Sequence, residues 1–259
     1  MKQTGRRVTR LMVAALGVFT CGSLAVPDAA AQLQAWEDRA YVNMNFVYQP
    51  TGLTLQESLG ATIYSEAATY GVTHSSSGGG LFDIGGGVRV WRNLAAGLAV
   101  TSLSTRSGAT VSAAVPHPLF YNRKRLADFA DTNLQHKQLG VHLHAVWVVP
   151  VNEKIDVAVS GGPSFFTVTQ SLVSSVTIAA EIGAPYNVVE VASIATDKVS
   201  KNAFGVNVGV DMSYKVTEHL GGGIFVRYGG GSVNIPTSGG EQSIDVGGVQ
   251  TGIGLRIRF

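Results

Sequence analysis

Apolar residues alternate one by one with polar or small residues along several segments of this chain. The clearest example covers residues 203–216, where seven apolar side chains from Phe204 to Val216 alternate with residues such as Asn207 and Asp211. Successive side chains of a β-strand point to opposite faces, so each such segment predicts a strand with one face suited to hydrocarbon and the other to water. The chain is therefore expected to be all-β.

The last eleven residues, 249–259, repeat this alternation. Their polar face carries Gln250, Arg256 and Arg258, and their apolar face includes Ile253, Leu255, Ile257 and Phe259. The pattern resembles the C-terminal strand of bacterial outer-membrane barrels, which ends in Phe and serves in that family as the signal read by the barrel-assembly machinery. We therefore predict a closed transmembrane β-barrel, with these four apolar residues as its assembly signal.

The alternation predicts eight antiparallel strands, at 39–49, 80–91, 94–104, 137–149, 155–170, 203–216, 220–228 and 249–259. An additional alternating piece at 62–72 would make nine, whereas both ends of a single-chain barrel lie on one side of the membrane and require an even number. We assign this piece to an extension within the first long loop. A ten-stranded barrel, with another strand within 105–136, is the alternative.

The predicted connections alternate between short and long. The short ones are Arg92–Asn93, 150–154 and 217–219, and the long ones are 50–79, 105–136, 171–202 and about 230–242. The segment 171–202 is rich in Val and Ile, so part of it is expected to extend its hairpin beyond the membrane. Short periplasmic turns and long extracellular loops are typical of outer-membrane barrels. We expect 73–79 to be a flexible loop and Gly161–Gly162–Pro163 to form a bulge or bend. Trp91 and Trp147 stand beside short turns, where an aromatic girdle is expected.

The first 31 residues predict a signal peptide. Four basic residues precede an apolar run at 11–26 that is shorter than the roughly 20 residues of a spanning helix, and cleavage is expected after Ala31. Residues 32–259 then form the barrel domain. The leader contains Cys21, the only cysteine, and removing its 4 basic and 1 acidic residues leaves 15 basic against 16 acidic residues. This balance gives no reason to expect nucleic-acid binding.

Tyr41–Val42–Asn43, the glycine-rich segment that ends Val88–Arg89–Val90–Trp91, and Phe259 together resemble the OmpA- and OmpW-like outer-membrane barrel families. The resemblance implies a monomeric, porin-like integral protein of a Gram-negative-type outer membrane, in contact with outer-membrane lipids and lipopolysaccharide. Its role is expected to be structural or surface-interacting through long loops, or passive transport of small or apolar solutes as in OmpW-like proteins. A lipid A-modifying enzyme is a third possibility, and a soluble periplasmic β-sandwich is the alternative fold.

Polar residues on the second face of the strands are expected to line the lumen. They are Asp83, Arg89, Gln138, His142, His144, Asp156, Asn207, Asp211, Lys215, Arg227, Gln250, Arg256 and Arg258. An eight-stranded barrel is just wide enough to be filled by side chains or to hold one small ligand. These groups therefore form either a plug of paired charges, which is favoured because unpaired buried charge is costly, or the lining of a narrow pore. Arg256 and Arg258 should meet carboxylates such as Asp156 or lie in a watery mouth.

Few residues indicate further chemistry. His142 and His144 share one strand face, which fits a hydrogen-bonded interior pair better than a metal site without a third ligand. His117 lies between two prolines, but no serine stands beside it in a catalytic pattern, so no catalytic residue, metal or cofactor is expected. Arg123–Lys124–Arg125, in an external loop, could bind lipopolysaccharide phosphates, although such charge runs are usually solvated.

Overall fold

The computed structural model describes residues 35–181, 183–237 and 240–259. The predicted signal peptide, 1–31, lies outside the described residues. No helix within the described residues is long and apolar enough to cross a membrane.

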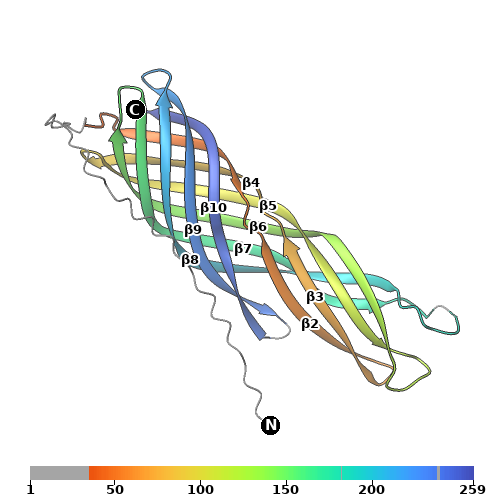
Figure 1. The fold of residues 1–259 in the computed structure, drawn as a ribbon. Coiled ribbons are helices and arrows are strands. Elements are labelled where there is room, and N and C mark those ends of the chain that lie inside the picture. Colours follow the sequence, from red (N-terminus) through yellow and green to blue (C-terminus); the bar gives the residue numbers. More distant parts are fainter. Residues whose placement is uncertain (1–34, 182, 238–239) are drawn as a thin grey trace, which may run out of the picture. The chain divides into compact units, whose positions relative to one another are not determined.

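The described part of the chain is built from ten β-strands (Figure 1). In chain order they are β1 (Ala40–Gln49), β2 (Leu53–Ile63), β3 (Glu66–Ser76), β4 (Gly79–Trp91), β5 (Leu94–Pro116), β6 (Lys124–Pro150), β7 (Ile155–Ile178), β8 (Val191–Lys215), β9 (Leu220–Thr237) and β10 (Gly240–Arg258).

Eight of these strands close into a ring of antiparallel neighbours. The order around the ring is β1, β10, β9, β8, β7, β6, β5 and β4, and the pairing of β5 with β6 completes it. The other two strands, β2 and β3, form a hairpin that joins β5 through β3. The predicted all-β ring of eight strands is confirmed, and the alternating piece at 62–72 belongs to this added hairpin. The strand expected within 105–136 in a ten-stranded ring is instead a continuation of β5 and β6.

The ring carries its apolar side chains outside and its polar side chains inside. On β8, Phe204 is 63% exposed and Val208 55% exposed, whereas Asn207 is only 4% exposed. Aromatic side chains stand near both ends of this outer apolar surface. Near the short turns they are Trp91, Trp147, Tyr214 and Phe259, and towards the other end they are Phe46, Tyr48, Phe82, Phe165, Phe204 and Tyr228. We call this outer surface the apolar belt.

Beyond the apolar belt, β5 and β6 continue as one ladder, to which β3 and β2 are added, and β7 and β8 continue as another (Figure 1). The ladder between β6 and β7 ends at His136 opposite Gln170, and we call the two continuing ladders together the extension. The ladder between β5 and β6 runs as far as Pro116 opposite Lys124, and the β7–β8 ladder as far as Ile178 opposite Val191. The prediction of a long polar connection at 105–136 is therefore wrong, as is that of a flexible loop for all of 73–79, because β3 reaches Ser76. Within 171–202, the expected extension of the hairpin is present as the continued β7–β8 ladder.

The extension pairs because it has an apolar interior of its own. Val111 and Val115 of β5 and Leu134 of β6 are buried there, and Val173 of β7 packs with them. Burying such side chains contributes roughly 1.5–3 kcal/mol each. β9 and β10 are also longer than predicted, because β9 ends at Thr237 and β10 begins at Gly240. These added residues include Ile235 and Ile244, which fill the interior between the ring and the extension.

Of the bulge or bend predicted at Gly161–Gly162–Pro163, the bulge is wrong. His142 pairs with Ser164 and Ala145 pairs with Gly161, so the register of β6 against β7 is the same on both sides of the glycines. A real irregularity occurs in β10, where Gly247 and Gly248 have positive φ angles of 91° and 126°. The Thr51 side chain lies directly against Gly248, so only glycine leaves room for the crossing from β1 to β2.

Candidate functional site

The thirteen polar residues predicted to face the lumen all lie on ring strands, and the structure places them inside. Nine of them are buried, namely Asp83, Gln138, His142, Asp156, Asn207, Arg227, Gln250, Arg256 and Arg258. Arg89, His144, Asp211 and Lys215 are partly buried. On the outer face of β10, Ile253, Leu255 and Phe259 are exposed by 65%, 53% and 62%, and Ile257 is partly exposed.

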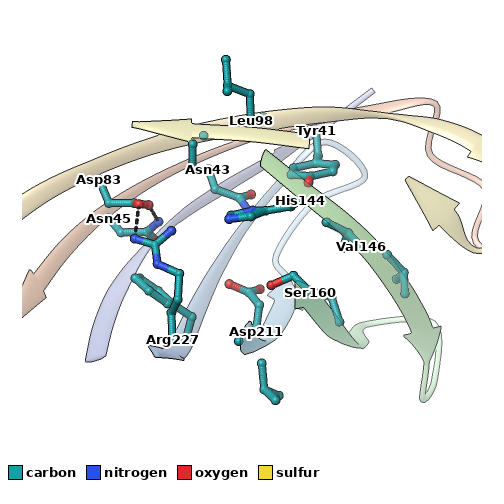
Figure 2. A pocket seen from close by; sticks show the side chains of 18 of the residues that line it. Tyr41, Asn43, Asn45, Asp83, Leu98, His144, Val146, Ser160, Asp211 and Arg227 are labelled. Carbon is teal, nitrogen blue, oxygen red and sulfur yellow. Dashed lines mark hydrogen bonds and ion pairs between the residues drawn. The ribbon is translucent and has the colours of Figure 1, made fainter. Parts of the chain in front are cut away.

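An ion pair between β4 and β9 crosses the middle of the ring (Figure 2). The Nη2 of Arg227 lies 2.7 Å from Oδ2 of Asp83, and Nδ2 of Asn45 donates to the other carboxylate oxygen at 2.6 Å. Arg227 also donates to Oε1 of Gln250, whose amide in turn donates to Gln49. This layer satisfies each charge with a partner and several hydrogen bonds, which is the condition for burying a charge without a large penalty.

A second ion pair lies next to the first. Arg256 makes a bidentate contact with Asp211, Nε to Oδ1 at 3.1 Å and Nη2 to Oδ2 at 2.5 Å. Its Nη1 donates to Oδ1 of Asn45 at 2.5 Å, so Asn45 links the two ion pairs. The inward carboxylate expected for Arg256 is therefore Asp211 and not Asp156, whose ion pair is with Lys215 at 3.5 Å.

The mouth beside the short turns is filled by a residue that the sequence analysis did not single out. Trp36, which precedes β1, is 2% exposed. Its N–H donates to Oδ1 of Asn93 at 3.3 Å, its carbonyl accepts from Arg89, and its indole donates to Oδ2 of Asp38 at 3.0 Å. Asp38 also lies 3.4 Å from the ammonium of Lys215. Trp36 lies outside every alternating segment, so in the sequence only its residue type could have indicated a buried role.

The lumen histidine His142 is held by neutral hydrogen-bond partners. Nδ1 of His142 lies 2.8 Å from Oγ of Ser164, and its Nε2 lies 3.2 Å from Oγ1 of Thr101. The ring of His144 stacks on that of His142 at 6.1 Å. The Ser164 hydroxyl also accepts from Asn207 at 2.8 Å. Both Ser164 and His142 are 0% exposed. Within the described residues, no group of three or more His, Cys, Asp or Glu is placed to hold a metal ion.

The space left inside the ring is small. A cavity of about 80 Å³ lies between Trp36 and the Arg227–Asp83 pair, and Tyr41, His144 and Asp211 also line it (Figure 2). Ligand pockets for drug-sized molecules are about 300–1,000 Å³, whereas this volume suits a few water molecules. On the side of the ion pairs that faces the extension, the interior becomes apolar, and Phe166 and Leu55 are fully buried there. Paired charges and apolar packing therefore fill the path along the ring.

The far end of the extension is fastened by one buried arginine. Arg125 makes two contacts of 2.7 Å with the carboxylate of Glu181 and donates to the carbonyls of Pro116 and Tyr186 at 2.9 Å. Tyr64, between β2 and β3, donates to Glu181 at 2.9 Å. We call this arrangement the Arg125 latch. The hydrogen bonds from Arg125 lower the pKa of the Glu181 carboxyl.

This geometry changes the interpretation of the basic run in the external loop. Arg125 is 6% exposed and its charge is paired, so it is not free to bind phosphate. Arg123 and Lys124 remain exposed, and the Arg123 guanidinium lies over the ring of Phe120 at 5.4 Å.

No family model matches this chain, and no curated protein matches it either. Solved structures with a similar arrangement are Neisserial surface protein A, the outer membrane protein AlkL and the outer membrane protease OmpT of Escherichia coli. Sequence identities are 13%, 13% and 11%, and TM-scores are 0.40, 0.40 and 0.38. The matches cover 85%, 86% and 88% of this chain, and 97%, 90% and 99% of those chains.

Breaking the central ion pair should destabilise the ring more than removing both of its members. Asp83→Leu leaves the Arg227 charge buried without its partner and is expected to cost about 3–5 kcal/mol, whereas Asp83→Leu with Arg227→Leu should recover most of this loss. Denaturant unfolding of the refolded protein in lipid vesicles measures both. Asp197→Leu, at an exposed position of β8, is the control. Additive losses in the double variant would contradict the pairing.

The Arg125 latch should loosen in acid. Because the folded-state pKa of Glu181 is lowered, its stabilising effect is present at neutral pH and is lost as the pH falls below 4.5, the ordinary value, through the lowered pKa. Pepsin cleavage within 183–190 should therefore accelerate over this range, relative to cleavage of the unfolded protein. Glu181→Gln should remove the pH step, and Glu190→Gln, at an exposed position, should keep it. An unchanged step in Glu181→Gln would rule out the latch.

Proposed function

We propose that this chain is an integral outer-membrane β-barrel protein that displays a rigid surface-interaction module and is closed to solutes. The observation that carries this proposal is the distribution of side chains in the ring. Apolar side chains are exposed on its outside, and its interior is filled and ion-paired. A ring with this distribution would be unstable in water because of its exposed apolar area, and it matches a barrel immersed in hydrocarbon.

The height of the apolar belt supports a membrane location. On β8 it runs from Phe204 to Val216, which corresponds to roughly 30 Å along the barrel axis for a strand tilted by about 40°. The apolar band of outer-membrane barrels is about 25 Å tall. Closure of the ring through β5 and β6 satisfies the backbone groups that hydrocarbon cannot.

The two ends of the ring differ as the two sides of an outer membrane would require. Tight turns join β4 to β5, β6 to β7 and β8 to β9 at the end that holds Phe259, whereas the extension lies at the other end (Figure 1). Short turns face the periplasm in this class of barrel, so we assign the extension to the cell exterior. Its hydrogen-bonded ladders and the Arg125 latch hold it in one shape suited to contact with a surface partner.

A second candidate is movement of small apolar molecules through the side of the extension. Among the described strands β2 pairs only with β3, and its other edge faces β10 without a hydrogen-bonded ladder. A cavity of about 20 Å³ lies at this edge and is lined by Leu53, Val168 and Ile244. Its small volume makes this the weaker candidate.

The proposal predicts a barrel without conductance. Protein reconstituted in planar bilayers should give no single-channel steps, and liposomes should take up neither small sugars nor small apolar solutes faster than empty liposomes. Trp36→Ala should also stay closed, because the Arg227–Asp83 layer and the apolar interior above it remain. Regular steps in the unaltered protein would contradict the closed interior, and faster uptake of apolar solutes alone would favour the second candidate.

A further inference from the structure

Large exposed apolar side chains occur in two separate zones of the described residues. One zone is the apolar belt, and the other lies at the far end of the extension and consists of Tyr64, Leu119, Phe120, Tyr121, Leu126 and Val188. Tyr121 is 86% exposed and Phe120 is 53% exposed. Between the two zones, the outer face of the extension carries small and polar residues such as Thr110 and Ser200. The second zone therefore requires an explanation separate from the first.

We propose that segment 119–124, which we call the tip, inserts into the interface of an apposed anionic lipid bilayer. This inference rests on the surface-interaction role proposed above and names its partner as a second membrane. The tip combines three adjacent apolar side chains, Leu119 to Tyr121, with the two exposed cations Arg123 and Lys124. Aromatic rings at the headgroup level beside basic residues are the usual means of binding an anionic membrane surface.

The charges around the tip favour an anionic partner. Among the described residues, the carboxylate of Glu66 contacts the tip, where it accepts the backbone N–H of Asn122 at 3.0 Å. The carboxylate of Glu181 is paired with Arg125. Arg123 and Lys124 thus set two positive charges against the one negative charge of Glu66, and Arg123 lies close to the ring of Phe120. An approaching negative surface would meet cations and aromatic rings together.

The tip is held in shape while its aromatic rings stay in water. Nδ1 of His117 accepts the backbone N–H of Leu119 at 3.1 Å, and its ring lies 4.9 Å from that of Phe120. Nε2 of His117 lies 3.2 Å from the carbonyl of Pro185 in the neighbouring loop. The exposed rings have thus been ordered before any partner binds, which lowers the entropy lost on insertion.

The size and position of the tip fit a bilayer better than a protein. A standard protein interface uses about 20–30 residues on each side, whereas the tip is the end of a single hairpin. From Leu139 at the top of the apolar belt to Lys124, β6 rises roughly 40 Å, given about 3.3 Å per residue and a tilt of about 40°. The tip is therefore held well away from the lipid that surrounds the ring, where another membrane can reach it.

The test uses the protein in phosphatidylcholine nanodiscs and measures its sedimentation with vesicles of phosphatidylcholine that contain or lack phosphatidylserine. The unaltered protein should bind only the vesicles with phosphatidylserine. Arg123→Gln with Lys124→Gln should weaken binding about 25-fold, close to fivefold for each charge. Phe120→Ser with Tyr121→Ser should abolish it. The matched control, Lys198→Gln with Lys201→Gln, changes two exposed cations of β8 and should leave binding unchanged.

An environment-sensitive dye separates insertion from contact. The single cysteine of the chain, Cys21, lies in the predicted leader, so Tyr121→Cys gives one labelling site in the mature protein. The dye at position 121 should shift to the blue with phosphatidylserine vesicles, whereas at Thr110→Cys, on the outer face of β5, it should not. Failure of the unaltered protein to bind, binding that survives Phe120→Ser with Tyr121→Ser, or binding without a blue shift would each overturn the inference.

Labelling of intact cells distinguishes this inference from the proposed function. A membrane-impermeant maleimide should reach Tyr121→Cys and should not reach Asn152→Cys, in the turn between β6 and β7. Labelling of position 121 without vesicle binding would leave the surface module in place and reject the lipid partner. Labelling of position 152 alone would reject the proposed orientation itself.

Discussion

The hydrogen bonds between β5 and β6 and between β1 and β10 close the sheet into a ring, and every other feature depends on that closure. A ring has no free strand edge within the apolar belt, so its outer side chains can be apolar throughout. Closure of eight strands also creates a narrow interior, which side chains can fill. The interior must then be filled, and polar side chains that fill it must find partners in one another.

The interior meets this requirement both between neighbouring strands, as in the pair of Lys215 with Asp156, and between strands that are not neighbours in the ring. Arg227 of β9 reaches Asp83 of β4, and Arg256 of β10 reaches Asp211 of β8, with Asn45 between them. On the extension side of these pairs the interior no longer needs polar partners, because the outer face of the extension is the polar one. Apolar residues therefore turn inward there, and the polar lumen ends against them. The same strands thus supply both the ring with its apolar outer surface and the extension with its apolar interior.

The sequence predicts the ring well because most of its large apolar residues point outward, as on β8, whereas a few such as Val47 and Phe225 are buried inside. The part of the extension formed by β5 and β6 was not predicted for a physical reason: on β6 the apolar side chain at Leu139 faces outward while that at Leu134 faces inward, so the apolar face reverses beyond the apolar belt. The inward polar residues could be predicted from alternation alone. Their partners could not be predicted, because whether Asp211 or Asp156 lies beside Arg256 depends on how the strands close into the ring.

The most direct test of this account is the accessibility of spin labels placed one at a time along residues 201–216 of the protein in lipid bilayers. From residue 204 onward, labels at even positions should collide with oxygen dissolved in the lipid, while labels at odd positions should be shielded from both oxygen and a water-soluble relaxation agent. At the exposed position Lys201 the water-soluble agent should dominate. Equal access at even and odd positions, or free access of the water-soluble agent to Asn207 and Asp211, would contradict a closed, ion-paired interior.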